Sequence, residues 1–240
     1  MSRRYLITGG TSGIGAAVAR HLTSHGHRVL ITGTSRASVD AALAEGVAAH
    51  GAVADVTDAT AVETAFSEAV AAFGGLDGVF ANAGIDGEGK PAEELDAGVF
   101  RRVLEVNTVG VLLVAQAAHR HLDRPGTLVV NASVNAVRPE AHFADYNASK
   151  AATLALAKTL ALEWSADQLS VTSICPGYFP SRMTNDWLTD PEVAPQLLGL
   201  IPAGRFGRLD EVGALVEFLL GPEAPFLTGA AITIDGGRNI

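Results

Sequence analysis

The feature of this 240-residue sequence that most constrains its fold is a regular alternation of short apolar segments with segments of helical periodicity. The expected strands are rich in Val, Ile, Leu and Ala, and they lie at 5–8, 28–32, 47–53, 76–81, 127–131, 169–175 and 230–234. The expected helices lie at 14–24, from 35 or 36 onward, 58–72, 98–121, 144–165 and 209–220. Short strands that alternate with helices form parallel sheets covered on both faces, with right-handed crossovers. The sequence therefore predicts an α/β fold with about seven strands in a doubly wound parallel sheet, as one domain over 1–240.

Composition and charge narrow the class of partner. Hydrophobic residues make up 48% of the chain, which is incompatible with a disordered protein. The formal net charge of −9 disfavours nucleic acid and anionic membranes, because both select clustered Lys and Arg. No signal peptide is visible, and no apolar run approaches the length of a membrane span. We therefore expect a cytoplasmic protein whose partner is a small molecule.

A glycine-rich turn follows the first expected strand. It reads Thr-Gly-Gly-Thr-Ser-Gly-Ile-Gly over positions 8–15 and leads into the first expected helix. Glycines let the backbone turn tightly and approach a phosphate, and a helix N-terminus offers unpaired N–H groups and a positive dipole end. Although the spacing is G-x-x-x-G-x-G rather than G-x-G-x-x-G, this position predicts a Rossmann-type dinucleotide site.

Tyr146 and Lys150 stand four residues apart on an expected helix, so they share one face. A carbonyl that is reduced must gain a proton at its oxygen, and an alcohol that is oxidised must lose one. A phenol can serve both directions, but its ordinary pKa of about 10 is high. Because a nearby ammonium favours the phenolate, we expect Lys150, with a cationic nicotinamide alongside, to lower the pKa of Tyr146.

Further motifs occur in order along nearly the whole chain. Asn82-Ala83-Gly84 follows the fourth expected strand, Pro176-Gly177 follows the sixth, and Asp235-Gly236-Gly237 follows the last. With the glycine-rich turn and Tyr-x-x-x-Lys, they make the chain resemble the short-chain dehydrogenase/reductase family. The resemblance implies a hydride transfer between a nicotinamide dinucleotide and the carbon of a secondary alcohol or ketone.

The same resemblance implies roles for individual residues. Ser133 would hydrogen-bond the reacting oxygen, and Asn107 would hold a water that links Lys150 to solvent as a proton relay. The implied catalytic set is Asn107, Ser133, Tyr146 and Lys150. The implied cofactor-binding set is Gly9, Thr11, Ser12, Gly13, Ile14, Gly15, Thr34, Ser35, Arg36, Asp55, Val56, Asn82, Ala83, Gly84, Tyr146, Lys150, Pro176, Gly177, Phe179 and Ser181.

The end of the second expected strand bears on the choice of dinucleotide. NAD enzymes usually place an acid there to bind the ribose 2′-hydroxyl. This chain has Gly33, followed by Thr34, Ser35 and Arg36, which offer hydroxyls and a guanidinium to a 2′-phosphate. We therefore expect NADP(H) in preference to NAD(H), although Ser12 replaces the basic residue that many NADP enzymes of the family carry.

The substrate is the least constrained part of the prediction. The stretch 178–208 has four prolines and few regular signals, so we expect a lid there. An apolar lid above a few polar groups suits a small or medium alcohol or ketone. No metal site is expected, because His142 lacks a second ligand at coordinating spacing. The candidate substrate residues are Asn135, Arg138, His142, Phe143, Tyr178, Met183 and Trp187.

Two alternatives to a secondary-alcohol dehydrogenase stay open at this point. One is a 3-oxoacyl-thioester reductase, as for acyl-carrier-protein substrates. The other is a catalytically silent dinucleotide-binding sensor or scaffold, which would be expected to carry a lesion among the four implied catalytic residues. The family resemblance also implies a homotetramer, or a homodimer, packed through the long helices.

Overall fold

A seven-stranded parallel sheet forms the centre of the protein, whose computed structural model describes residues 2–181 and 183–240. The strand order is β3-β2-β1-β4-β5-β6-β7, so the order reverses between β1 and β4. The strands are β1 (Arg4–Ile7), β2 (Arg28–Gly33), β3 (His50–Val53), β4 (Gly78–Ala81), β5 (Gly126–Asn131), β6 (Leu169–Pro176) and β7 (Ala231–Ile234). This topology confirms the predicted doubly wound α/β fold.

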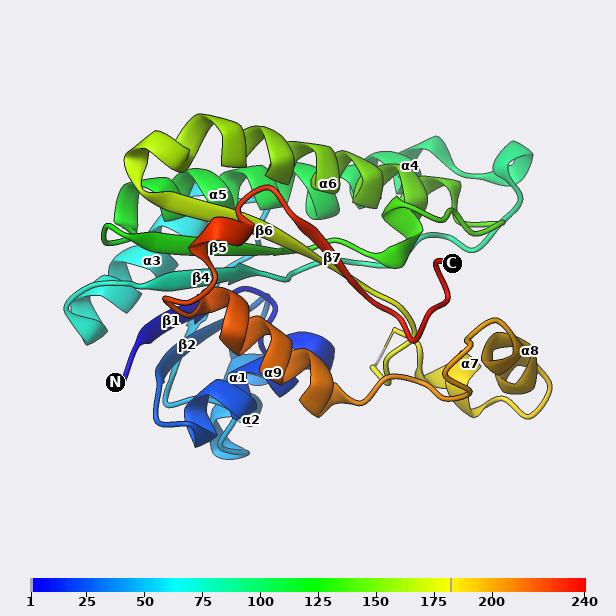
Figure 1. Ribbon diagram of the computed structural model, residues 1–240, viewed down its shortest axis with the longest axis horizontal. Helices are drawn as coiled ribbons and strands as arrows, with labels where there is room; N and C mark the ends of the chain where they lie inside the picture. The colour runs from blue at the N-terminus through cyan, green and yellow to red at the C-terminus, as the bar shows by residue number, and fades with distance from the viewer. Residues whose placement is uncertain (1, 182) are drawn as a thin grey trace.

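Helices cover both faces of the sheet (Figure 1). One face carries α3 (Ala59–Phe73), α4 (Ala97–Leu104), α5 (Gly110–His121) and α6 (Ala144–Trp164). The other face carries α1 (Gly13–Ser24), α2 (Arg36–Ala44) and α9 (Leu209–Leu220). Two short helices, α7 (Asn185–Thr189) and α8 (Val193–Gly199), extend beyond the carboxyl ends of the strands. Among the described helices, none is long and apolar enough to cross a membrane.

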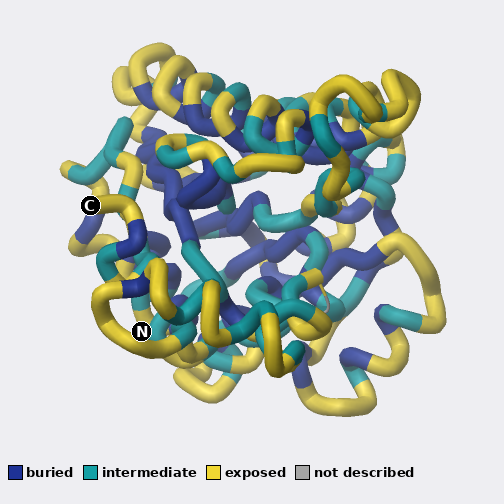
Figure 2. The backbone as a smooth tube through the Cα atoms, turned by 90° about the vertical axis from the view of Figure 1, so that its right-hand side faces the viewer, coloured by how far each residue is buried: buried dark blue, intermediate teal, exposed yellow. Residues whose placement is uncertain are grey.

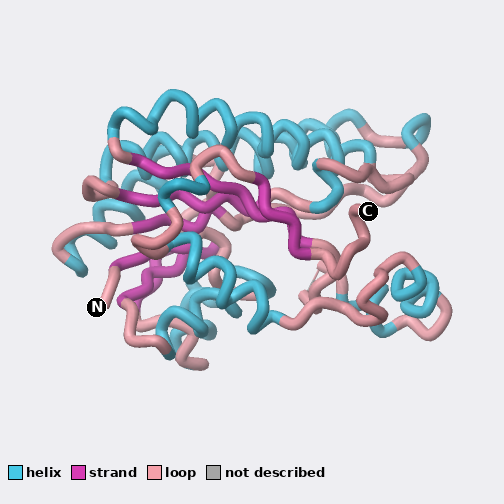
Figure 3. The backbone as a smooth tube through the Cα atoms, in the orientation of Figure 1, coloured by secondary structure: helices cyan, strands magenta, loops and turns pink. Residues whose placement is uncertain are grey.

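The strands at the centre of the sheet are mainly apolar because helices bury both of their faces. All four residues of β4 and all eight of β6 are buried. Figure 2 shows this buried centre beneath exposed outer helix faces, and Figure 3 shows the strands running through it. Two apolar cores result, one on each side of the sheet.

The structure corrects several predicted boundaries. The third strand begins at His50 rather than at residue 47, because Val47 N donates to Ala42 O at 3.0 Å and so belongs to the turn that ends α2. The helix expected over 98–121 is interrupted by a π-helical turn at Glu105–Val109. The stretch 178–208, where the sequence has few regular signals, contains α7 and α8, while Arg182 lies outside the described residues.

The reversal of strand order determines where a ligand can bind. The loops after β1 and β4 run to opposite sides, which opens a crevice at the carboxyl ends of the strands. The predicted glycine-rich turn follows β1 and Asn82-Ala83-Gly84 follows β4, so the fold brings both segments to this crevice.

Candidate active site

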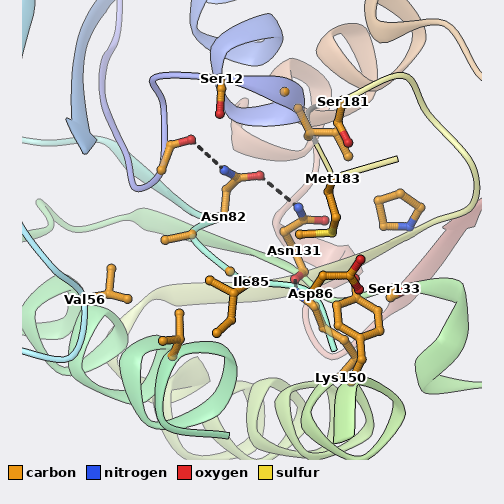
Figure 4. Close-up of a pocket in the computed structure, with 18 of the residues that line it drawn as sticks. Ser12, Val56, Asn82, Ile85, Asp86, Asn131, Ser133, Lys150, Ser181 and Met183 are labelled. Atoms are coloured by element: carbon orange, nitrogen blue, oxygen red, sulfur yellow. Dashed lines mark hydrogen bonds between the residues drawn. The ribbon is translucent and has the colours of Figure 1, made fainter. Parts of the chain in front are cut away.

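A cavity of about 590 Å³ occupies this crevice at the carboxyl ends of the strands (Figure 4). Its wall includes the loop into α1, the residues after β2, β3, β4, β5 and β6, and the catalytic face of α6. Of the residues predicted to bind cofactor or catalyse, these line the cavity: Gly9, Thr11, Ser12, Gly13, Ile14, Thr34, Asp55, Val56, Asn82, Ala83, Gly84, Ser133, Tyr146, Lys150, Pro176, Gly177, Phe179 and Ser181.

The loop into α1 is built for close approach of a ligand to the backbone. Gly9 and Gly13 have φ angles of +63° and +55°, which side chains rarely adopt. A Cβ at Gly15 would lie 2.4 Å from the carbonyl oxygen of Gly9, so Gly15 supports the loop from behind rather than lining the cavity. Ser12, the N-cap of α1, makes no side-chain cap, so its hydroxyl leaves the first-turn N–H groups available to a ligand. This cradle fits a dinucleotide pyrophosphate.

A chain of hydrogen bonds connects the loop to the centre of the sheet. The Asn82 amide donates to the carbonyl oxygens of Thr8 at 3.0 Å and Gly9 at 3.2 Å. Its Oδ1 accepts from Asn131 Nδ2 at 2.9 Å, as the dashed lines in Figure 4 show. The carbonyl oxygen of Asn131 accepts from Lys150 Nζ at 2.9 Å. These bonds fix the position of the Lys150 ammonium relative to the loop.

Tyr146 lies beside Ser133 at the inner end of the cavity. Burial raises the pKa of Tyr146 to about 12, although a hydrogen bond with the Ser133 side chain acts in the opposite direction. Asp86 and Glu140 raise this pKa further, because negative charges disfavour a phenolate. The side chains of this protein alone therefore do not acidify the phenol, and the expected lowering of its pKa by Lys150 with a cationic nicotinamide alongside stays a prediction for the cofactor-bound protein.

Lys150 is nearly inaccessible to solvent, with 4% of its surface exposed. Burial lowers the pKa of its ammonium to about 8. Its Nζ lies 5.6 Å from the centroid of the Tyr146 ring. The amine thus lies one helical turn beyond the phenol along α6, as predicted, but desolvation disfavours its charged ammonium form.

Asn107 lies behind the cavity rather than in its wall. Its side chain accepts from Ile85 N at 2.8 Å and donates to Ile85 O at 2.9 Å and Ser149 Oγ at 3.0 Å. Its backbone carbonyl oxygen accepts a hydrogen bond from Thr153 Oγ1 at 2.6 Å. Asn107, in the π-helical turn, therefore joins the loop after β4 to α6.

At the outer end of the cavity, Thr34 lines the wall, whereas Ser35 and Arg36 stand beside it. Ser35 caps α2 by accepting from Ser38 N. The Arg36 side chain is 67% exposed and makes one ion pair, with Asp40 at 3.7 Å. This long contact leaves the guanidinium free to reorient.

Among the described residues, only Met183 of the predicted substrate set lines the cavity. Arg138 Nη1 donates to the carbonyl oxygen of Arg238, and Asn135 Nδ2 donates to Asn147 Oδ1 at 3.1 Å. His142 is exposed with φ +68°. These three are engaged by the protein or face solvent and lie outside the wall of this cavity, so their contact with a substrate stays a prediction.

The remaining predicted substrate residues belong to contacts of the lid. Phe143 packs edge-on against Trp187 of α7, with ring centroids 5.6 Å apart. Tyr178 donates a hydrogen bond to Glu140, which raises the pKa of Tyr178 after the larger effect of burial. They connect the segment after β6 to the loop before α6, outside the cavity wall.

The sequence reading did not single out several residues of the wall. Asn131 is a polar residue at the end of a buried strand, and that contrast is a signal that could have found it. Asp86 lies in a loop and Arg102 on an expected helix, and only tertiary structure brings the two to the cavity. The missed wall residues are Gly33, Ala54, Ile85, Asp86, Arg102, Val106, Asn131, Ala132 and Thr184.

Known proteins are similar to this chain in sequence and in fold. Residues 9–239 match the family model described as Enoyl-(Acyl carrier protein) reductase. The chain is 35% identical to cis-4-hydroxycyclohexanecarboxylate dehydrogenase of Sinomonas cyclohexanicum over 97% of this chain and 94% of that protein.

Solved structures agree with these sequence matches. A short-chain dehydrogenase from Burkholderia cenocepacia in complex with NADP superposes with a TM-score of 0.89 and 35% identity, covering 99% of this chain and 98% of that one. The 3-ketoacyl-(acyl-carrier-protein) reductase from Brucella melitensis complexed with NADH gives a TM-score of 0.89 and 28% identity, with the same coverage. The chain therefore belongs to the short-chain dehydrogenase/reductase family, and it is an NAD(P)-dependent oxidoreductase of alcohols or carbonyl compounds.

Proposed function

We propose that this protein is an NADP(H)-preferring dehydrogenase of a secondary alcohol, or reductase of the corresponding ketone, with Tyr146 as the proton-transfer residue. The observation that carries this proposal is the meeting of the Tyr146 phenol and the Ser133 hydroxyl at the inner end of the dinucleotide cavity. Two hydroxyls at that place can hold one substrate oxygen between them.

A nicotinamide dinucleotide held by the loop into α1 would supply or accept the hydride at the substrate carbon. In the reductive direction the Tyr146 hydroxyl donates its proton to the substrate oxygen, and in the oxidative direction the phenolate accepts that proton. Ser133 donates a hydrogen bond to the same oxygen and stabilises its developing charge. Lys150, positioned by the carbonyl oxygen of Asn131, places an ammonium below the phenol.

Asn107 supports this arrangement as a positioning residue. It holds the backbone of Ile85, next to the cavity wall, and the first turns of α6 through Ser149. We propose that Asn107 also holds a water that links Lys150 to solvent.

We propose in addition that the segment 178–208 acts as a lid over the cavity. At the base of this segment, Thr184 Oγ1 accepts a hydrogen bond from Ser181 N at 3.1 Å.

Fluorescence titration with NADPH and NADH, followed by a panel of alcohols and ketones with the preferred cofactor, tests the proposed function. Turnover of a secondary alcohol or its ketone is the expected result. Activity confined to an acetoacetyl thioester would favour the 3-oxoacyl-thioester reductase instead. Cofactor binding without turnover across the whole panel would support a silent dinucleotide sensor and overturn the proposal.

The preference for NADP(H) is tested by Arg36→Ala. A charge-assisted hydrogen bond is worth about 1.5–3 kcal/mol, so we expect the KM for NADPH to rise roughly 10- to 100-fold. The KM for NADH should not change, because no 2′-phosphate is present. Lys158→Ala, a cation outside the cavity wall, is the matched control. Equal effects on both dinucleotides would contradict the NADP assignment.

Asp86 favours substrates that carry hydroxyl groups beside the reacting carbon over substrates with a carboxylate there. It lines the cavity near Ser133 (Figure 4). Its Oδ1 accepts from Gly87 N at 2.9 Å, and its charge raises the pKa of Tyr146. Burial raises the pKa of Asp86, and this half-buried carboxylate would repel a neighbouring anion.

We therefore expect Asp86→Asn to change substrate selection. The ratio of kcat/KM for a hydroxylated neutral ketone to that for its carboxylated analogue should fall by about tenfold, because one charged hydrogen bond and one repulsion are both removed. The measurement is a competition between the two ketones. An unchanged ratio would show that Asp86 does not contact the substrate.

Oligomeric state is the last part of the proposal. Leu162 is exposed on α6, one of the long helices that the family resemblance places in a tetramer, and Phe218 of α9 and Phe226 beyond it are exposed as well. A homotetramer, or a homodimer, would remove them from water. Light scattering coupled to size-exclusion chromatography measures the mass directly, and a monomer at micromolar concentration would contradict this part.

A further inference from the structure

Three histidines surround one glutamate on the face of the protein that carries α1 and α9. His21 is in the last turn of α1, His25 caps its carboxyl end, and His27 precedes β2. Glu217 reaches them from α9. None of these four lines the dinucleotide cavity, so the cluster is not explained by the proposed reaction.

The ligand atoms of this cluster converge on a single point. Glu217 Oε2 lies 2.8 Å from His21 Nε2 and 2.7 Å from His25 Nδ1. These nitrogen and oxygen atoms all lie within 4.8 Å of one another. Metal ligands bound at about 2.0–2.2 Å are separated by roughly 3–3.5 Å, so a small outward movement of the side chains would admit an ion.

His27 has a different role, which its hydrogen bonds determine. Its Nδ1 accepts from the backbone N–H of Arg3 at 3.1 Å, so the ring proton of the neutral imidazole is on Nε2. Nε2 therefore donates to Glu217 Oε1, at 3.1 Å. A protonated nitrogen cannot bind a metal, but it can orient the carboxylate that does. His27 is thus a supporting residue, and the ligands are His21, His25 and Glu217.

The surrounding packing holds the ligands in place. A Cβ at Gly213 would lie 2.9 Å from His21 Cβ, which shows how closely α9 crosses α1 at this point. The His21 and His27 side chains are largely buried, at 18% and 12% exposed, whereas His25 is 50% exposed. The cluster therefore has two rigid sides and one side open to solvent, through which an ion could enter.

The donor set selects the class of metal. Two imidazoles and one carboxylate suit Zn²⁺ and neighbouring divalent transition metals, whereas Mg²⁺ and Ca²⁺ prefer oxygen ligands alone. His21 in the last turn of α1 and His25 at its C-cap are four residues apart, which is the spacing of two zinc-binding histidines on a helix. A solvent molecule would complete the tetrahedral shell.

We propose that His21, His25 and Glu217 form a Zn²⁺-binding site that joins the carboxyl end of α1 to α9, with His27 orienting the glutamate. The site lies at the end of α1 opposite the dinucleotide loop, away from the cavity. Zn²⁺ bound here stabilises the fold by linking two helices and takes no part in hydride transfer.

Calorimetric titration of the untagged, metal-free protein with ZnCl₂ tests this site. We expect one equivalent to bind, and we expect the thermal unfolding midpoint to rise with free Zn²⁺ because the ion binds the folded state. Oxidoreductase activity at a temperature well below the midpoint should be the same with and without the metal. MgCl₂ at the same concentration should leave the midpoint unchanged.

Variants separate this site from other histidines. His25→Ala and Glu217→Gln should each reduce Zn²⁺ affinity at least 100-fold and abolish the thermal shift. His25 is half exposed, so its loss should not prevent folding. His119→Ala is the matched control, because His119 also pairs with a carboxylate, Asp167 at 3.0 Å, but lies outside the cluster. Absence of saturable binding, or binding that both ligand variants retain, would overturn the proposal.

Discussion

Replacing Tyr146 with phenylalanine is expected to lower kcat by at least about 1,000-fold in both directions of the reaction. The substitution removes one hydroxyl, and with it the group that exchanges a proton with the substrate oxygen. General acid–base catalysis contributes roughly 10²–10⁴-fold to the rate. The variant also loses one of the two hydrogen bonds to the substrate oxygen, which lowers kcat further. Steady-state kinetics with the substrate found in the panel, together with NADPH titration, measures the effect.

Binding of the dinucleotide should survive this substitution nearly unchanged. The pyrophosphate cradle is the loop into α1, which Tyr146→Phe does not alter. The lost hydrogen bond with Ser133 should cost only about 1 kcal/mol of stability, because Ser133 Oγ also accepts from Asn135 N at 3.1 Å. A variant that binds NADPH normally and retains more than a tenth of the kcat would refute Tyr146 as the proton-transfer residue.

Lys150→Met is expected to lower kcat about 100- to 1,000-fold and to move the pH profile. Burial already lowers the pKa of the Lys150 ammonium to about 8, so it is charged below that pH. Removing this cation disfavours the Tyr146 phenolate and raises the pKa of the phenol. Alcohol oxidation needs the phenolate, so its rate rises with pH through that pKa, and the rise should shift to higher pH in the variant.

The pH dependence of kcat for alcohol oxidation measures this shift. Lys158→Met, on the same helix but outside the cavity wall, is the control that should keep the parental profile. A Lys150→Met enzyme with reduced kcat but an unshifted profile would mean that Lys150 acts only through the Asn131 carbonyl, as a structural support. That result would contradict the electrostatic role.

The sequence predicted the fold and the inner site because their signals are local. Apolar strands buried on both faces are readable as runs, and the loop over 8–15 is defined by glycines whose conformations the structure confirms at Gly9 and Gly13. Tyr146 and Lys150 share a helix face as a consequence of helical spacing alone. Each of these features depends on residues that are neighbours in the chain.

What the sequence did not predict depends on contacts between distant segments. The raised pKa of Tyr146 arises chiefly from burial beneath several elements, which no spacing reveals. Arg138 pairs with the carbonyl oxygen of Arg238, one hundred residues away, and so turns from the cavity. The cluster around Glu217 likewise joins residues nearly two hundred positions apart, although the three closely spaced histidines are visible in the sequence.

The central claim, that a nicotinamide bound beside Tyr146 makes its phenol acidic, is tested most directly by titrating the tyrosines. The chain has three, and burial raises the pKa of Tyr5 and of Tyr146 to about 12 and that of Tyr178 as well. Ultraviolet absorbance against pH should therefore detect no phenolate near pH 9 in the protein alone. With saturating NADP⁺, one phenol should ionise about two to three pH units lower, and Tyr146→Phe should lose that transition. Identical titrations of the two proteins with NADP⁺ would contradict the claim.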